Sequence, residues 1–404
     1  MSKELKPRYR WVILALAWLI YFSFGLIMSS LSALIIPIMR DLDLAYTQMG
    51  LIAGAWPLVY IFIAYLNGLL IDVIGPYRSL FIGVAVIALS EGLRGIAVNF
   101  LSLFVAVGIF GFGGSLISVG LPKLIASWFT GEERGTASGV YATGPAAGGM
   151  VGLMITNSFV LPAVGTWRNV FLLYGLLGFL VSIIWLLLGR RPLPTSGKDK
   201  TEKIRIFDVM RILLKLKNVW VIIIVGVGAF MLMHSFSAWL PTILELNGMT
   251  PALAGFTTSI SSLFGIIGSL IIPRASYLVG SKKLTISFAL FITGIAIFIN
   301  GTSGGLTLWV GIVLFGLFQA ALMPMLLLTL MEIPEVGSKY MGMAGGIFFT
   351  FVEVGGFLGP LITGYIKDVT SSFYLGIIFL TVVAEVMIIP TIFLEEKKEL
   401  THEV

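Results

Sequence analysis

Two acid–base side chains, Glu353 and His234, lie in long apolar stretches of the sequence. If those stretches cross a membrane, a charge at their centre costs roughly 2.5 to 3.5 kcal/mol, so each such residue needs a partner or a task. Glu353 is either a group that exchanges protons or contacts a substrate, or a structural carboxyl held by hydrogen bonds. Histidine as a residue type titrates near physiological pH, which makes His234 a candidate for proton coupling, although a single histidine among apolar neighbours is more often a hydrogen-bonded core residue.

Glu91 and Arg94 form a second candidate group. They are three residues apart, so they share one face of a helix and can form an ion pair. The pair is either structural, or its guanidinium fork attracts an anion and the pair belongs to a site for substrate or protons.

The stretches around these residues are too apolar for a soluble protein. Of 404 residues, 58% are hydrophobic and 11% are charged, against roughly 25% charged in an average soluble domain. Asp, Glu, Lys and Arg are absent from Trp11 to Met39, Gly95 to Pro122, Leu246 to Pro273 and Leu284 to Met331. Each stretch reaches the ~20 residues that a spanning helix requires. Because glycines are frequent and strand-like alternation is missing, we predict an all-α membrane protein surrounded by lipid.

The apolar stretches divide into twelve spans. They are expected near 11–37, 48–71, 79–98, 101–128, 137–161, 169–188, 219–241, 252–278, 283–300, 305–330, 343–366 and 373–394. Of 26 Lys and Arg residues, 20 fall on the side of both termini, three on the opposite side and three within spans. Because cytoplasmic loops retain basic residues, both termini are predicted to be cytoplasmic in a multi-pass protein of the plasma membrane. The net charge of +6 therefore reflects topology, and no nucleic-acid partner is expected.

A hydrophilic segment divides the spans into six plus six. It predicts an N-terminal half at 1–188, a cytoplasmic linker at 189–218 and a C-terminal half at 219–404. Short glycine-containing strings recur in the two halves at similar offsets, as in two pseudo-symmetric bundles. Such repeats place a binding site between the halves near the midplane, with access that alternates by rocking of one half against the other.

One loop motif resembles a known family. Gly68, Asp72, Gly75 and Arg78 match the G-x-L-x-D-x-x-G-x-x-[RK] signature that follows the second span in the major facilitator superfamily. The glycines allow close packing and a tight turn, and Asp72 can cap the N-terminus of a neighbouring helix, plausibly the eleventh span, in one access state only. Val73 departs from the family pattern, which often has a basic residue there.

Weaker similarities point to the cyanate-permease-like and organic-anion porter branch. They lie at Gly92-Leu93-Arg94, Leu121-Pro122-Lys123, Trp167-Arg168 and Trp239-Leu240-Pro241. The string Gly144, Pro145, Gly148 and Gly149 in the fifth span resembles an antiporter signature of drug exporters, or is a kinked helix-packing face. In this fold the first, fourth, seventh and tenth spans line the cavity, which implies that Tyr21, Trp239 and Gln319 contact the substrate.

The sequence lacks the motifs of an enzyme. It has no cysteine, no P-loop and no paired-histidine metal motif, so we expect no cofactor, no metal and no catalytic residue. The resemblance implies a monomeric secondary transporter that moves a small organic or inorganic monoanion by alternating access, coupled to protons. Two alternatives stay open: proton-driven efflux of amphipathic or drug-like compounds, and a receptor or sensor that binds without transport.

Overall fold

The computed structural model describes residues 9–190, 211 and 213–396, which form helices and no strand. The linker predicted at 189–218 lies mostly outside these residues. The first group of helices is α1 (Tyr9–Ala33), α2 (Ile35–Leu42), α3 (Tyr46–Ile74), α4 (Pro76–Gly95), α5 (Phe100–Trp128), α6 (Gly131–Ala142), α7 (Gly144–Ile155), the π-helix η1 (Thr156–Val160), α8 (Leu161–Val164) and α9 (Trp167–Leu188). The second group is α11 (Lys217–Leu246), α12 (Pro251–Val279), α13 (Lys282–Thr302), α14 (Gly305–Met331), α15 (Gly337–Thr370), α16 (Tyr374–Val386) and α17 (Ile388–Ile392).

Twelve helical segments are long and apolar enough to cross a membrane, as predicted. The segment at Gly131–Val164 combines α6, α7, η1 and α8, and the last one combines α16 and α17. The first span was expected to reach residue 37, but α1 ends at Ala33 and the short helix α2 follows. Pro37 explains the break, because a proline ring collides with the carbonyl group four residues earlier in a continuous helix.

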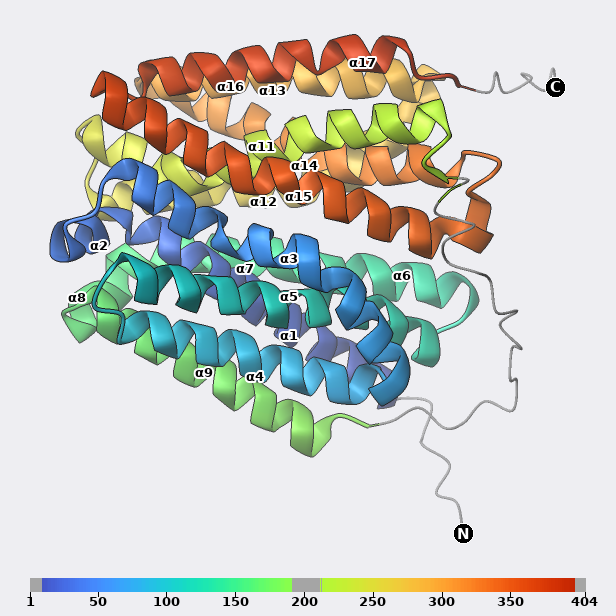
Figure 1. Cartoon of the computed structure of the whole chain (residues 1–404), viewed down its shortest axis with the longest axis horizontal. Coiled ribbons are helices and arrows are strands. Elements are labelled where there is room, and N and C mark those ends of the chain that lie inside the picture. Colours follow the sequence, from blue (N-terminus) through green and yellow to red (C-terminus); the bar gives the residue numbers. More distant parts are fainter. Residues whose placement is uncertain (1–8, 191–210, 212, 397–404) are drawn as a thin grey trace.

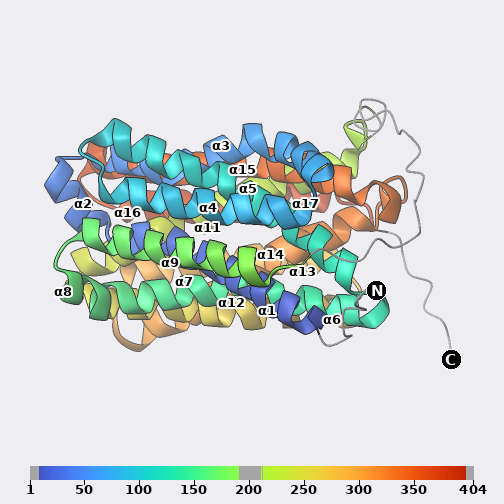
Figure 2. The same cartoon turned by 90° about the horizontal axis from the view of Figure 1, so that it is seen from below.

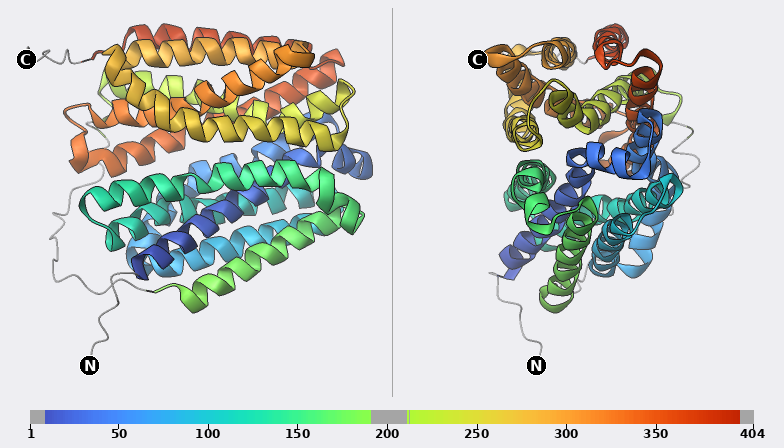
Figure 3. Two further views of the ribbon diagram at one scale, coloured as in Figure 1. Left: turned by 180° about the vertical axis from the view of Figure 1, so that it is seen from behind. Right: turned by 90° about the vertical axis from the view of Figure 1, so that its left-hand side faces the viewer.

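The helices pack as two groups that lie side by side (Figure 1). In the first group α1 packs against α7, and α4 packs against α5 and α9; in the second, α11 packs against α15, and α14 packs against α12 and α13. The groups meet mainly where α3 touches α15 and where α7 touches α12. Figures 2 and 3 show the same two groups from below, from behind and from one end.

The two groups are in close contact at one end of the molecule. We call this end the far face; it carries α2, the start of α3 and the end of α15, on the left in Figure 1. A Cβ added to Gly50 would lie 2.5 Å from the carbonyl oxygen of Pro360, and one added to Gly364 would overlap the carbonyl oxygen of Tyr46. Gly255 of α12 is equally tight against Leu153 of α7. Small residues therefore let the backbones of the two groups touch.

The groups are apart at the opposite end, the terminal face, where α1 begins and α17 ends (Figure 1). Cβ atoms built on Gly68 of α3 and on Gly345 and Gly346 of α15 would have no described atom of another element within 4 Å. The same helix pair that is sealed at the far face is thus open at the terminal face. In this conformation α3 and α15 pack against each other at the far face and diverge toward the terminal face.

Candidate functional site

The structure brings His234 of α11 and Glu353 of α15 together. Nε2 of His234 lies 3.9 Å from Oε2 of Glu353, and the two residues are 6% and 4% exposed. The glycines that follow Glu353 make this possible, because a Cβ on Gly356 would lie 2.6 Å from Oε2 of Glu353 and 2.9 Å from Nδ1 of His234. The sequence offered each residue as a candidate, and the fold pairs them.

The N-terminal half reaches this pair through one aromatic side chain. The ring of Trp56, in α3, stacks on the imidazole of His234 at 5.1 Å between centroids, and Phe230 stacks on the same imidazole at 5.5 Å. Trp56 also contacts the rings of Phe24 and Phe110. It therefore connects the acid–base pair to the core of the opposite half. Trp56 was not among the sequence-predicted residues, because one aromatic residue in an apolar span carries no signal of its own.

Two buried oxygens on α14 and α15 lack hydrogen-bond partners among the described residues. They are Oε2 of Glu353 and Oε1 of Gln319. The amide nitrogen of Gln319 donates to the carbonyl oxygen of Ala229, 2.8 Å away on α11, which fixes the side chain. Buried acceptors in proteins are normally satisfied, so both oxygens can accept a hydrogen bond from a solute or from water, and the carboxylate of Glu353 can also take up a proton. On the other half, the hydroxyls of Tyr60 and Ser118 share a hydrogen bond of 3.0 Å.

Glu91 and Arg94 form a buried ion pair inside the N-terminal half. Nη1 of Arg94 lies 2.8 Å from Oε2 of Glu91, and the hydroxyl of Ser30 donates to Oε1 of Glu91 at 2.8 Å. Arg94 also donates to the carbonyl oxygen of Ile27 at 3.3 Å and lies over the ring of Phe110. These partners belong to α1, α4 and α5, so the pair ties three helices of one half together.

Two other predicted substrate contacts, Tyr21 and Trp239, pack against other partners. Tyr21 packs against the rings of Phe24 and Tyr141, within the N-terminal half. Trp239 is buried near the far face, where its Nε1 donates to the carbonyl oxygen of Pro360 at 3.0 Å and links α11 to α15. Tyr21, Trp239 and Gln319 were predicted to contact the substrate. Among these three, Gln319 has a buried acceptor oxygen, Oε1, without a hydrogen-bond partner among the described residues.

The loop motif lies at the terminal face. Gly75 adopts a φ of 81°, the left-handed region that favours glycine, and lets α3 turn directly into α4. Arg78 is exposed in the first turn of α4. Asp72 lies 2.6 Å from Nζ of Lys123 of α5, within its own half. Gly68 has open space around it in this access state.

The glycine-rich string of the fifth span packs against α1. A Cβ on Gly148 would overlap the carbonyl oxygen of Phe22, and one on Gly144 would lie 3.0 Å from that of Trp18. Pro145 approaches Gly25 equally closely, and Gly149 lies beside the same glycine. The string therefore forms the close contact of α1 with α7.

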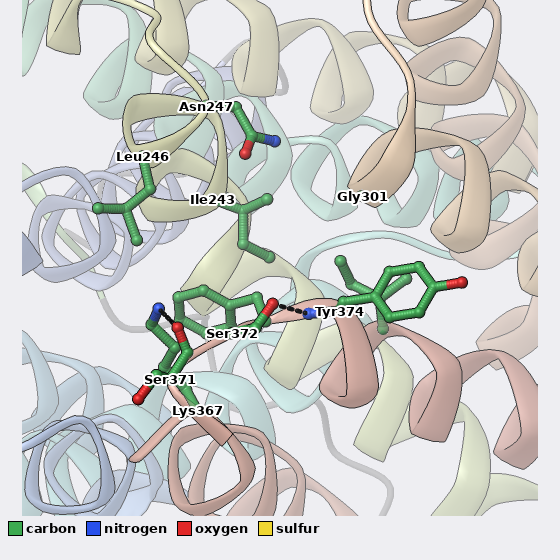
Figure 4. A pocket seen from close by; sticks show the side chains of 10 residues that line it. Ile243, Leu246, Asn247, Gly301, Lys367, Ser371, Ser372 and Tyr374 are labelled. Atoms are coloured by element: carbon green, nitrogen blue, oxygen red, sulfur yellow. Dashed lines mark hydrogen bonds between the residues drawn. The ribbon is translucent and has the colours of Figure 1, made fainter. Parts of the chain in front are cut away.

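A separate pocket of about 320 Å³ opens at the far face of the C-terminal half. Figure 4 shows that it is bordered by Asn247 just after α11, by Ser371 and Ser372 between α15 and α16, and by Tyr374 at the start of α16. Lys367 points toward this loop, where its Nζ donates to the carbonyl oxygen of Ser371 at 2.7 Å. In the described part of the chain, no group of three His, Cys, Asp or Glu residues is placed to hold a metal ion.

Twelve apolar spans in two groups, with a buried acid–base pair that contacts an aromatic ring of the opposite half, are the architecture of a polytopic membrane transporter. The chain belongs to the Major Facilitator Superfamily, whose profile matches residues 17–360 and, in a second overlapping match, 245–402. It is therefore a transporter and not an enzyme.

Relatives agree with this assignment, and a solved structure shares the fold. The chain is 26% identical to a hexuronate transporter of Bacillus subtilis, over 83% of each chain. It is 24% identical to a D-galactonate transporter of Escherichia coli, over 82% of this chain and 83% of the relative. A crystal structure of a bacterial homolog of the human lysosomal transporter Spinster, in an inward-facing and occupied conformation, matches with a TM-score of 0.75 at 16% identity, over 96% of this chain and 94% of that one.

Proposed function

We propose that the protein carries a small organic monoanion across the plasma membrane, together with protons held by His234 and Glu353. The observation that carries the proposal is the buried contact of these two side chains, 3.9 Å apart, beneath the Trp56 ring of the opposite half. The names of the relatives support the substrate class, since hexuronate and galactonate are sugar acids with one carboxylate.

Charge explains how the pair would couple protons to an anion. With both protons removed the pair carries −1, with one proton it is neutral, and with two protons it carries +1. At a distance of ~5 Å and an effective dielectric constant of ~20, a substrate carboxylate and the unprotonated pair repel each other by about 3 kcal/mol. Anion and proton therefore bind together, and neither is carried efficiently alone.

Polar groups of α14, α3 and α5 fit a hydroxylated solute. The free Oε1 of Gln319 accepts a hydrogen bond from a substrate hydroxyl, and the hydroxyls of Tyr60 and Ser118 offer both donors and acceptors. The Trp56 ring provides a flat surface for the C–H face of a sugar acid. A site of this kind selects by hydroxyl pattern as well as by charge.

Movement of the two halves would carry this site between the faces. We propose that the halves 1–188 and 219–404 rock as rigid bodies about the site in a monomer, while the linker 189–218 joins them. The excess of basic residues on the side of the termini supports a cytoplasmic terminal face. The conformation described above would then be the inward-open one.

Uptake into proteoliposomes tests the proposal. Vesicles with purified protein would receive labelled D-glucuronate or D-galactonate, with the dianion galactarate and neutral D-glucose for comparison, with and without an imposed pH gradient. We expect monoanion accumulation that requires the gradient. Extrusion of an amphipathic dye against the gradient would support efflux instead, and saturable binding without flux would support a receptor.

Variants of the pair separate coupling from binding. We expect Glu353→Gln and His234→Gln to abolish gradient-driven accumulation, with exchange of internal for external substrate retained by Glu353→Gln. Glu132→Gln, an exposed carboxylate in the first turn of α6, is the matched control and should behave as the wild type. Gradient-driven accumulation that survives in both pair variants would refute the assignment of the coupling site.

A further inference from the structure

The helix α3 begins without a capping side chain of its own. Its N-cap residue is Ala45, and alanine is a poor N-cap because its side chain offers no acceptor to the first N–H groups of the helix. Gln48 reaches back and accepts the N–H of Ala45 at 3.0 Å. The N–H groups of Tyr46 and Thr47 lie in the first turn, where a helix cannot supply acceptors from its own backbone.

Asp368 of α15, in the other half, supplies those acceptors. The N–H of Tyr46 donates to Oδ1 of Asp368 at 3.0 Å, and the N–H of Thr47 donates to Oδ2 at 2.7 Å. The hydroxyl of Thr47 donates to the same Oδ2 at 2.5 Å. A carboxylate is also favoured at the positive end of a helix dipole. The C-terminal half thus caps a helix of the N-terminal half.

The surrounding contacts tie this cap to closure of the far face. Nζ of Lys367 lies 5.4 Å from the centroids of the Tyr46 and Phe373 rings, and these two rings contact each other edge to face. Gly364, one turn before Asp368, touches the backbone of Tyr46. The cap joins the two groups of helices, so separation of the groups at the far face would break all three hydrogen bonds at once.

We propose that Asp368 is a positioning residue of the transport cycle, a latch that stabilises the state open at the terminal face by capping α3 from the opposite half. The inference rests on the alternating-access part of the proposed function and is independent of the substrate and of proton coupling. A cap of this kind shifts the ratio of the two access states by about 5- to 30-fold, the factor that corresponds to a typical N-cap contribution.

Spin-label distances measure that ratio directly. The sequence has no cysteine, so pairs can be introduced without removing native ones. Exposed positions Val98 and Leu306 report on the far face, and exposed positions Val73 and Leu278 report on the terminal face. We expect Asp368→Asn to lengthen the first distance and shorten the second in the substrate-free protein. Asp43→Asn, a neighbouring exposed far-face aspartate, is the matched control and should leave both distances unchanged.

A second variant distinguishes a latch from a residue that only stabilises the fold. Ala45→Asp gives α3 a cap within its own half, so the N–H groups are satisfied in both access states. It should raise thermal stability yet shift the distances in the same direction as Asp368→Asn. Asp368→Asn should then have little further effect in the Ala45→Asp background.

Unchanged distances in Asp368→Asn would overturn the latch. The latch would also be overturned if Asp368→Asn changed the spin-label distances equally in the wild-type and Ala45→Asp backgrounds. The change would then come from something other than the cap. Failure of the proposed function would look different: the latch distances would respond as expected, while the proteoliposomes would show no gradient-driven uptake of sugar acids.

Discussion

The ion pair of Glu91 and Arg94 allows a test that separates a structural role from an anion site. Both side chains are buried, with exposures of 0% and 1%, and their partners are Ser30 and the carbonyl oxygen of Ile27. Arg94→Met would leave the carboxylate of Glu91 with the hydroxyl of Ser30 as its remaining partner. Breaking one side of a buried pair costs about 3 to 5 kcal/mol, because a charge stays buried without compensation.

Removing both charges should behave differently. Glu91→Leu together with Arg94→Met replaces the pair by apolar side chains of similar length inside an apolar bundle. Such replacements are neutral or stabilising by about 1 to 4 kcal/mol. The double variant should therefore recover most of the stability that either single variant loses, and it should transport as the wild type does.

Thermal unfolding in detergent and uptake into proteoliposomes would be measured on the same four proteins. Single variants with low melting temperatures and a double variant with a normal one would establish the coupling between the two side chains. A double variant that is stable but inactive would refute the structural assignment and return Arg94 to the substrate path. A double variant as unstable as the single ones would show that the pair is not the source of the stability.

Three further outcomes follow from the geometry. Asp72→Asn should slow transport while expression stays normal, as uptake per milligram of protein would reveal. Gly148→Ala should destabilise by about 1 to 3 kcal/mol or more, because its Cβ meets the backbone of α1, while Gly139→Ala, which faces open space, should melt normally. The hydrogen bond from Arg168 holds the pKa of Asp41 below its ordinary value of 3.8. This contact therefore stabilises the protein above that pH and is lost as the pH falls below it. The melting temperature of Asp41→Asn should depend less on pH in that range than the melting temperature of the wild type.

The helices could be predicted from sequence because membrane solvation acts on each span separately. A stretch such as Trp11 to Met39 has no charge, and its length alone indicates a spanning helix. The break after Ala33 was missed, although Pro37 is a local signal for it. The error of a few residues arose because the apolar pattern continues past Ala33, although the backbone geometry imposed by Pro37 ends the helix there.

The site was harder to predict because it depends on contacts between distant spans. His234 and Glu353 each stood out as an ionisable residue in an apolar stretch, but nothing local states that α11 and α15 bring them together. Trp56 carried no such signal, since one aromatic residue in an apolar helix looks like any core residue. The role of Asp368 could not be predicted for another reason. It depends on Ala45, an N-cap residue in the other half of the chain whose side chain cannot accept a hydrogen bond from the first turn of α3.

Asp72 and Asp368 together suggest why the two access states can be close in energy. Each lies near the C-terminal end of its helix, α3 or α15, where the helix dipole disfavours a negative charge by about 0.3 to 1 kcal/mol. Because α3 and α15 run in opposite directions, each carboxylate lies at the end of the molecule at which the other helix begins. Asp368 has its partner in the state described here, and Asp72 is held by Lys123 instead. When the far face opens and the terminal face closes, we expect Asp368 to lose its contact with the N-terminus of α3. Asp72 is then expected to gain a contact with a helix N-terminus of the other half. One cap replaces the other, so neither access state is strongly favoured in free energy.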